Sequence, residues 1–297
     1  MKALAIDLGG SKAAFAVVDG EGRILCRTKR PSHEGAAALS FEALARAARE
    51  TIEAAGLRLD ELDGAGVIIP GIYDAATGRG WAPNLWGDRQ VDVRDALAPL
   101  LPVRLAIDSD RSGYVLGESW LGAARGCTDA VFLGVGTGIG AGLLCGGRVV
   151  RGAGGIAGAV GWFATDPSWT PQGTLGCWEA QASAPALARR VGARDGKAVT
   201  DAARKGDPSA RRAVEQAAEA LAMGIADLIS ALNPQVVVLG GGLMQASDLF
   251  LEPIRRAVPR WAQPIAAREC RIVPTALGQD AGLLGAARLA LFEGARS

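Results

Sequence analysis

The chain has 297 residues, of which 49% are hydrophobic, and 32 basic against 31 acidic residues leave a formal charge of +1. This length is enough for two lobes of ordinary size, each with its own core. The even charge balance, without a run of five like charges, argues against a nucleic-acid surface as the main function. The five cysteines are scattered and form no C-x-x-C pair, so the sequence indicates neither a disulfide framework nor a cysteine-only zinc site.

The N-terminal sequence, MKALAIDLGG, lacks the apolar core of a signal peptide, and no apolar run reaches membrane-spanning length. We therefore expect a soluble, cytoplasmic protein with no membrane partner. The only histidine, His33, lies in a polar segment near the start of the chain. We expect it at the surface, without a catalytic role.

Two segments of the chain carry the same order of structural signals. Residues 3–25 predict a strand, a glycine-rich turn, a second strand, a DGEG turn and a third strand, and residues 130–150 repeat this order. Aligning the two segments places Gly9 over Gly136 and Gly10 over Thr137. A fixed correspondence of this kind indicates a duplicated lobe.

The rest of the chain alternates between helix and strand signals. Helices are expected at 40–56, 209–234 and 280–295, and strands at 64–71, 102–110 and 236–242. This order predicts an α/β protein of two similar lobes with a cleft between them, where ligands usually bind. We place the N-terminal lobe at 1–112 plus 280–297 and the C-terminal lobe at 113–279.

Both duplicated hairpins have a glycine-rich turn, DLGGSK at 7–12 and GVGTGIG at 134–140. Glycine lets backbone N–H groups approach an anion together, as in loops that bind phosphates. Neither turn matches G-x-x-x-x-G-K-[ST] or leads into a helix, which argues against a P-loop and a Rossmann site. One such turn is usually only a tight turn. Two matched turns and a third glycine cluster at 240–242 favour a nucleotide held between the lobes.

Seven segments occur in an order known from one family of proteins. They are DLGGSK (7–12), IIPGIYD (68–74), PNLWG (83–87), IDSDRSGYVLGE (107–118), GVGTGIGAG (134–142), GCWEAQASAPAL (176–187) and VVLGGGL (237–243). With these segments the chain resembles a sugar kinase of the ROK family, within the actin, hexokinase and Hsp70 ATPase superfamily. The resemblance covers nearly the whole chain and implies the two-lobed, actin-like (ribonuclease H-like) ATPase fold.

The resemblance also implies a site for ATP and Mg²⁺. Asp7 would hold Mg²⁺ through water. Nine residues would bind the nucleotide: Gly9, Gly10, Ser11 and Lys12 at the phosphates from one lobe, Thr137 and Gly138 at the phosphates from the other, and Gly240, Gly241 and Gly242 beside the adenosine.

By the same resemblance the activity would be ATP-dependent phosphorylation of a primary hydroxyl of a hexose, an amino or acylamino sugar, or a cyclitol. Phosphoryl transfer requires a carboxylate that accepts the proton of the attacking hydroxyl. Asp110 is the candidate general base, since it follows a predicted strand and begins the family pattern that ends at Glu118. Its position alone would equally fit an ordinary helix N-cap.

Sugar specificity depends on hydrogen bonds to each hydroxyl, because an unpaired polar group costs roughly 1–3 kcal/mol. The resemblance assigns these contacts to Gly71, Asn84, Ser109, Asp110 and Glu179. Asn84 follows Pro83 and would also fit a simple turn residue.

Three positions depart from the family pattern. Ser109 stands where Asn is usual, and the E-x-G-H segment is replaced by Ala159 to Trp162. Arg111 replaces a small residue, as either a solvated helix residue or an added anion contact. These changes favour a modified hexose or a cyclitol, with plain glucose or fructose left open. Trp162 would either stack on a sugar ring or fill space in the loop.

Many family members bind a structural zinc through that histidine and three cysteines. The corresponding residues here are Trp162, Thr170, Gln172 and Cys177, of which only the cysteine is a potential ligand. A closed structural zinc site needs about four N or S ligands. We therefore expect no zinc.

The competing interpretation is a non-catalytic sugar or nucleotide sensor with a kinase-like fold. Asp7, both glycine turns and Asp110 are all present, and a sensor does not need a base. ROK repressors carry a DNA-binding helix-turn-helix before the core, whereas the core here begins at residue 2, so we expect an enzyme. The resemblance is compatible with a homodimer.

Overall fold

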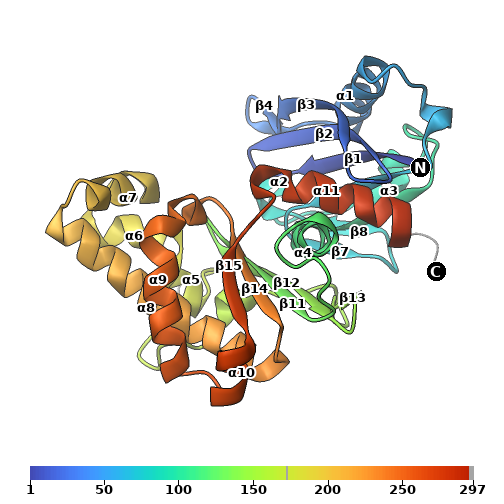
Figure 1. Cartoon of the computed structure of the whole chain (residues 1–297). Helices are drawn as coiled ribbons and strands as arrows, with labels where there is room; N and C mark the ends of the chain where they lie inside the picture. Colours follow the sequence, from blue (N-terminus) through green and yellow to red (C-terminus); the bar gives the residue numbers. More distant parts are fainter. Residues whose placement is uncertain (172, 294–297) are drawn as a thin grey trace. The chain divides into compact units, whose positions relative to one another are not determined.

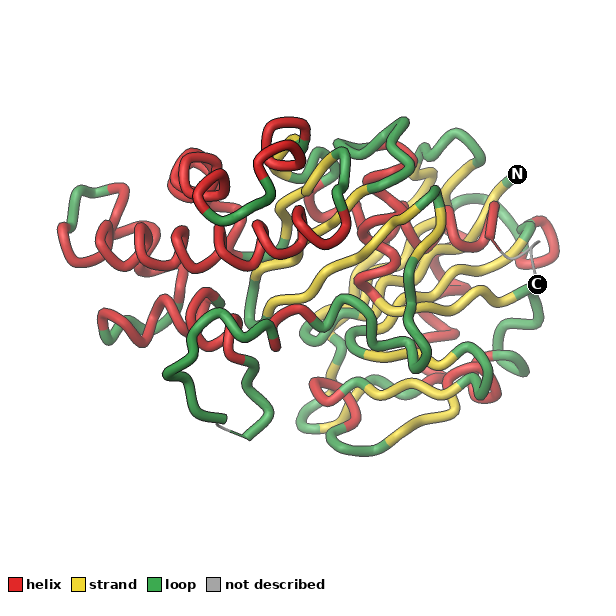
Figure 2. Tube along the Cα trace, turned by 90° about the horizontal axis from the view of Figure 1, so that it is seen from below, coloured by secondary structure: helices red, strands yellow, loops and turns green. Residues whose placement is uncertain are grey.

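The computed structural model describes residues 1–171 and 173–293, which pack as two compact units. The first unit contains residues 1–125, 151–156 and the described residues from 277 onward, and the second contains 126–150 and 157–276. Both units combine strands and helices, as the colouring of Figure 2 shows. Each unit has its own hydrophobic core.

The first unit is built on a five-stranded sheet in the order β10-β6-β1-β2-β3 (Figure 1). Its strands are β1 (Lys2–Leu8), β2 (Lys12–Asp19), β3 (Ile24–Pro31), β6 (Gly64–Ile69) and β10 (Leu105–Ser109). Strand β1 pairs antiparallel with β2 and parallel with β6, and β6 pairs parallel with β10. The fully buried β6 is therefore a central strand, in agreement with its continuous apolar sequence.

Helices and short strands cover this sheet. The helices are α1 (Phe41–Ala54), α2 (Pro83–Trp86), α3 (Val93–Leu97), α4 (Asp110–Leu121) and α11 (Ala281–Arg288), which continues as a π-helical turn over Leu289–Glu293. The short strands are β4 (His33–Glu34), β5 (Ala37–Ala38), β7 (Ile72–Asp74), β8 (Arg79–Trp81) and β9 (Gln90–Asp92). Ser40 caps α1, since its hydroxyl accepts the Ala43 N–H at 3.2 Å.

Helices α4 and α11 pack against each other through glycines (Figure 1). A Cβ added at Gly285 would lie 1.8 Å from the Gly113 carbonyl oxygen, and one at Gly117 would lie 2.3 Å from that of Ala281. On the sheet side, a Cβ at Gly66 of β6 would lie 1.8 Å from the Ala286 oxygen. Backbones this close leave no room for side chains, so the glycines fix α11 on the sheet and α4 on α11.

The second unit repeats the sheet of the first. Its strands, in the order β13-β12-β11-β14-β15, are β11 (Ala130–Val135), β12 (Ile139–Cys145), β13 (Arg148–Val149), β14 (Val236–Gly240) and β15 (Arg271–Pro274). Strand β11 pairs antiparallel with β12 and parallel with β14, as β1 does with β2 and β6. The predicted duplication is therefore present in the topology.

Six helices accompany this sheet among the described residues: α5 (Cys177–Ala182), α6 (Ala184–Val191), α7 (Gly196–Arg204), α8 (Pro208–Leu232), α9 (Ser247–Ala257) and α10 (Pro264–Glu269). Asp207 caps the long α8, and Asn233 ends it in a left-handed conformation with φ 45°. Along 1–171 and 173–293, no helix combines the length and the apolar character needed to cross a membrane.

The unit boundaries differ from those expected from the sequence. The expected boundary at residue 112 cuts α4, whereas the whole helix belongs to the first unit because it packs on α11. Residues 151–156 also belong to the first unit, although they lie within the stretch assigned to the C-terminal lobe. The assignment of binding roles to two lobes stays a prediction.

Replacing Gly285 by Val tests the packing of α4 on α11. The added side chain would meet the Gly113 backbone, so we expect a loss of about 1–3 kcal/mol in unfolding free energy by urea denaturation. The control is Gly154→Ala, whose Cβ has no neighbour closer than 3.7 Å. An unchanged stability of Gly285→Val would contradict this packing.

Candidate active site

Asp110 is the first residue of α4 and directly follows β10. The N-cap is Ser109, whose hydroxyl accepts the Ser112 N–H at 3.4 Å. The interpretation of Asp110 as an ordinary cap is therefore wrong, since its neighbour has that role. Ser109, proposed as a sugar ligand, is buried and already uses its hydroxyl in the cap.

The Asp110 carboxylate accepts two backbone hydrogen bonds from other residues. Its Oδ1 accepts the Arg111 N–H at 2.8 Å, and a second bond comes from the Gly71 N–H. Desolvation by the surrounding protein nevertheless raises the pKa of Asp110 to about 6, against the lowering effects of Arg111 and these bonds. The residue remains partly exposed, so a ligand can still reach it.

Asp7, on β1, is the second carboxylate of the site. Desolvation, and then the charge of Asp110, raise the pKa of Asp7 to about 7, although Lys29 lowers it. Within the described part of the chain, its covered Oδ1 has no hydrogen-bond partner. The pKa of Tyr114 on α4 is raised by the charge of Asp7, by desolvation and by Asp110, which places this tyrosine in the same cluster.

The Asp7 carboxylate fits a divalent cation such as Mg²⁺. Mg²⁺ prefers oxygen ligands and often takes only one or two carboxylates, completing its shell with water and phosphate. The Asp7 Oδ1 has no partner among the described residues, and burial disfavours its ionisation despite Lys29, so a cation beside it would favour the charged form. The described residues form no group of three or more His, Cys, Asp or Glu side chains at metal-binding distance, so protein ligands alone would not complete the shell.

The first glycine turn joins β1 to β2 and lies beside α2. The Gly9 N–H donates to the Lys12 oxygen at 3.0 Å, while Ser11 and Lys12 are exposed. A Cβ at Gly10 would lie 3.3 Å from the Asn84 Cβ. The structure therefore brings Asn84, in a short helix, next to the turn proposed to bind phosphates.

Arg111 is not a solvated helix residue. Its guanidinium donates to the Gly71 oxygen at 3.0 Å and to the oxygens of Gly155 and Ile156 at 3.5 Å. Desolvation lowers the pKa of Arg111, in opposition to the charges of Asp110 and Asp108. The expectation of a solvated helix residue is therefore wrong, and the added anion contact stays a prediction.

Two further carboxylates of the same strand and helix are buried: Asp108, which was not singled out in the sequence, and Glu118, which ends the family pattern. The buried Asp108 pairs with Arg151 at 2.7 Å. The fully buried Glu118 accepts the N–H groups of Ala123 at 2.7 Å and Leu277 at 3.2 Å. These contacts tie together segments distant in the sequence, which no local pattern signals. Glu118, the end of the family pattern, therefore stabilises the fold by binding these backbone N–H groups.

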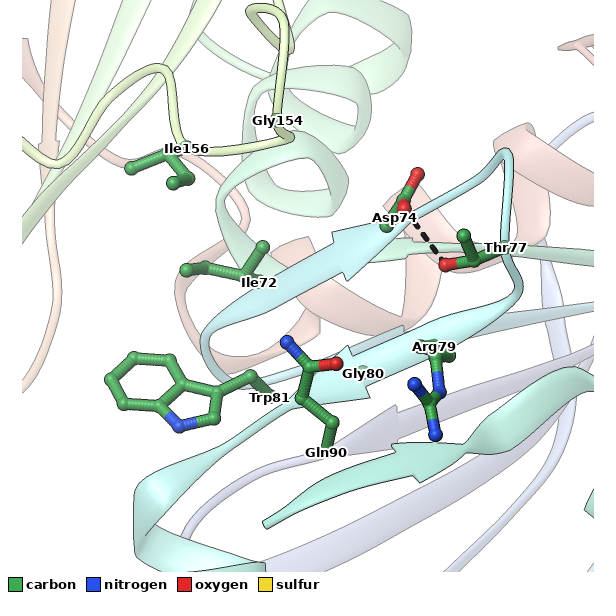
Figure 3. Close-up of a pocket in the computed structure, with 9 residues that line it drawn as sticks. All are labelled: Ile72, Asp74, Thr77, Arg79, Gly80, Trp81, Gln90, Gly154 and Ile156. Carbon is green, nitrogen blue, oxygen red and sulfur yellow. Dashed lines mark hydrogen bonds between the residues drawn. The ribbon is translucent and has the colours of Figure 1, made fainter. Parts of the chain in front are cut away.

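A cavity of about 380 Å³ lies in the first unit, and its lining includes Ile72, the residue after Gly71. It is lined by Ile72, Asp74, Thr77, Arg79, Gly80, Trp81, Gln90, Gly154 and Ile156 (Figure 3). Ile72, Trp81 and Ile156 lie toward one end, and the hydrogen-bonded Asp74 and Thr77 lie toward the other. The proposed sugar ligands do not line it, although Ile72 directly follows Gly71.

The second glycine turn, in the second unit, is attached to Glu179. The Glu179 Oε2 accepts the Ile139 N–H at 2.9 Å, and a Cβ at Gly138 would lie 2.6 Å from the same oxygen. Desolvation raises the pKa of Glu179, partly offset by the bond from Ile139. The structure thus places a proposed sugar ligand directly against the turn that contains Thr137, which is exposed.

The third glycine cluster lies beside the same turn. Gly241 has φ 88°, and its Cβ would meet the Val135 backbone at 2.5 Å. A Cβ at Gly136 would lie 3.6 Å from the Gly242 nitrogen. Together with Gly240, at the end of β14, these residues bring all the nucleotide-binding candidates of the second unit to one edge of its sheet.

The loop that precedes α5 divides into exposed and buried residues. Trp162 is 56% exposed, which excludes it as a space-filling residue, and Ala159 is partly exposed. Trp178 is fully buried, donates to the Ala220 oxygen at 2.7 Å and stacks on Phe163.

The positions aligned with zinc ligands have different surroundings. Cys177 is buried near Thr165, whereas Thr170 is exposed, and Gln172 lies outside the described residues. His33, on β4, is partly exposed.

Known proteins resemble this chain over nearly its whole length. A model of the ROK family matches residues 3–293. A glucokinase of Thermotoga maritima is 32% identical over 97% of both chains. A ROK hexokinase structure from Thermus thermophilus has a TM-score of 0.85 and 34% identity over 100% of both chains. A ROK family glucokinase from Streptomyces griseus, in complex with glucose and AMPPNP, has a TM-score of 0.79 and 29% identity, covering 97% of this chain and 99% of that one.

Replacing Asp7 by Asn tests the desolvated charge. Because folding raises the Asp7 pKa from 3.8 to about 7, the folded state holds the proton more tightly, and the resulting stability is lost as the pH rises through 7. Asp7→Asn should therefore melt higher than the wild type at pH 8 without Mg²⁺. The difference should vanish near pH 4.

The control for this pH dependence is Asp74→Asn. Hydrogen bonds from Thr77 and Ala76 lower the Asp74 pKa, so its charge stabilises the folded state, and this variant should melt lower at pH 8. A melting temperature of Asp7→Asn below that of the wild type at pH 8 would contradict this prediction. It would show that other groups stabilise the Asp7 charge in the folded state.

Proposed function

Because the chain belongs to the ROK family and is an ATP-dependent sugar kinase, we propose that it phosphorylates a primary hydroxyl of a sugar or sugar-like ring with Asp110 as general base. The predicted family and actin-like fold class are confirmed. The observation that carries the proposal is the coupled pair of carboxylates, Asp7 and Asp110.

Asp110 has the properties that a base in phosphoryl transfer needs. A pKa of about 6 leaves the carboxylate mostly ionised at neutral pH and yet more basic than an ordinary aspartate. The Arg111 and Gly71 N–H groups hold the carboxylate in one orientation. Asp110 would accept the proton of the attacking hydroxyl as the bond to phosphorus forms.

Asp7 would hold Mg²⁺, in keeping with its unpaired oxygen. The ion, when bound, would neutralise charge on the phosphates of ATP. Since Asp7 and Asp110 raise each other's cost of ionisation, a cation beside Asp7 would also favour the ionised base.

The glycine turns would hold the nucleotide through backbone N–H groups. In the first unit Gly9, Gly10, Ser11 and Lys12 would face the phosphates, with the Gly9 N–H already bonded to the Lys12 oxygen inside the turn, and in the second unit Thr137 and Gly138 would face them. The exposed positions of Ser11, Lys12 and Thr137 support a ligand-facing role. Gly240, Gly241 and Gly242 would border the adenosine.

The acceptor would be a hexose, an amino or acylamino sugar, or a cyclitol. Gly71, Asn84 and Glu179 are proposed to bind its hydroxyls. Ser109 would contribute through the hydrogen-bonding capacity that remains at its hydroxyl beside the capping bond. The glucokinase and hexokinase relatives support a hexose. Ala159 and the exposed Trp162 replace polar family residues and favour a modified hexose, whose C–H face Trp162 could cover.

Replacing Asp110 by Asn tests the base. The amide keeps the shape of the side chain but cannot accept the proton, so we expect kcat to fall by about 10²- to 10⁴-fold with the fold intact. ADP release with a panel of hexoses, amino sugars and cyclitols measures this loss.

The matched control is Asp95→Asn, another aspartate in the first turn of a helix of the same unit, which should keep its activity. Wild-type turnover by Asp110→Asn would end the assignment. Sugar binding without sugar-dependent turnover in the wild-type protein would favour the sensor.

The absence of a structural zinc is a separate prediction. Of the four aligned positions only Cys177 is a zinc ligand by type, and it is buried beside Thr165. Metal analysis of protein purified without chelator should find no stoichiometric zinc. One tightly bound zinc per chain would contradict the prediction.

A further inference from the structure

Arg111 connects the proposed base to two other backbone segments. Its guanidinium donates to the oxygens of Gly71, Gly155 and Ile156. The ion pairs formed among the described residues do not include Arg111. The hydrogen bonds of this partly buried guanidinium all go to carbonyl oxygens, although an arginine at the surface would be better hydrated. This arrangement indicates a positioning role.

The contact with Gly71 closes a ring of three residues. The Gly71 N–H donates to the Asp110 carboxylate, and the Gly71 oxygen accepts from the Arg111 guanidinium at 3.0 Å. The Arg111 N–H donates back to the Asp110 Oδ1 at 2.8 Å. Gly71 has φ 115°, a conformation that favours glycine. The bonds at its N–H and its oxygen tie both of its peptide groups to Asp110 and Arg111.

The other two contacts hold the segment 151–156 against the same turn. Gly155 fits closely there, since its Cβ would lie 2.6 Å from the Tyr73 oxygen. Ile156, whose oxygen Arg111 binds, lies opposite Ile72 in the cavity of Figure 3. One guanidinium therefore links the base to two walls of this cavity.

We propose that Arg111 is a positioning residue that keeps the Gly71–Ile72 turn and the segment 155–156 at a fixed place relative to Asp110. The inference rests on the proposed role of Asp110 as base. The fixed turn would hold the base and Gly71, a proposed ligand of the acceptor, in one arrangement. Lysine cannot replace this function, because one ammonium group does not reproduce the planar fork that reaches several carbonyls.

The test compares Arg111→Lys and Arg111→Met with the wild type. A small misplacement of reacting groups lowers the rate strongly, so we expect kcat to fall by about 10- to 100-fold in both variants. The KM for the acceptor should rise, and the KM for ATP should stay within twofold, because Arg111 contacts neither glycine turn. Thermal melting checks that the variants are folded.

Chemical rescue separates positioning from general stability. In Arg111→Ala, millimolar guanidinium should restore part of the lost kcat, whereas urea at the same concentration should not, since it lacks the charge. The matched control is Arg49→Met, which removes another arginine bound to a backbone oxygen of the first unit, that of Leu100. This control should keep the wild-type kcat.

Three results would overturn the proposal: wild-type kcat and KM in both Arg111→Lys and Arg111→Met, an equal loss of kcat in Arg49→Met, or a loss in Arg111→Ala that guanidinium does not reverse. Failure of the base itself is seen separately, as retained turnover in Asp110→Asn. In that case a loss in the Arg111 variants would report on the position of Gly71, a proposed ligand of the acceptor, alone.

Discussion

The structure of the first unit depends on holding two carboxylates, Asp7 and Asp110, where water solvates them poorly. Desolvation is the largest cause of the raised pKa at both residues. The negative charge of Asp110 raises the pKa of Asp7 further. Such an arrangement opposes folding at neutral pH, so the surrounding contacts must offset it. The close packing of α4 and α11 through Gly113 and Gly285 supplies a rigid support. In the proposed function, these destabilised charges would be used by a cation and by the attacking hydroxyl.

The duplicated hairpin is used differently in the two units. In the first unit its turn lies beside Asn84, on a separate short helix. In the second unit the Ile139 N–H, at the end of the turn, donates to the carboxylate of Glu179. The same backbone motif thus presents N–H groups twice, while the side chains beside it come from unrelated segments.

The sequence predicted the elements that local patterns determine. The strands of both hairpins, the cap at Ser40 and the end of α8 at Asn233 follow from apolar runs and capping residues. The position of Asp110 after a strand was also predictable. The contacts of Arg111 and the pairing of Asp108 were not, because they join segments some 40 residues apart that only the tertiary fold brings together.

The most direct measurement of the central claim is the titration of Asp110 in the free enzyme. Carboxyl carbon NMR of aspartate-labelled protein, with Asp110→Asn to assign the signal, reports this ionisation without substrate or metal. The Asp110 signal should titrate near pH 6, because the surrounding protein desolvates the carboxylate. A midpoint at or below pH 4 would show an ordinary solvated aspartate and would contradict it.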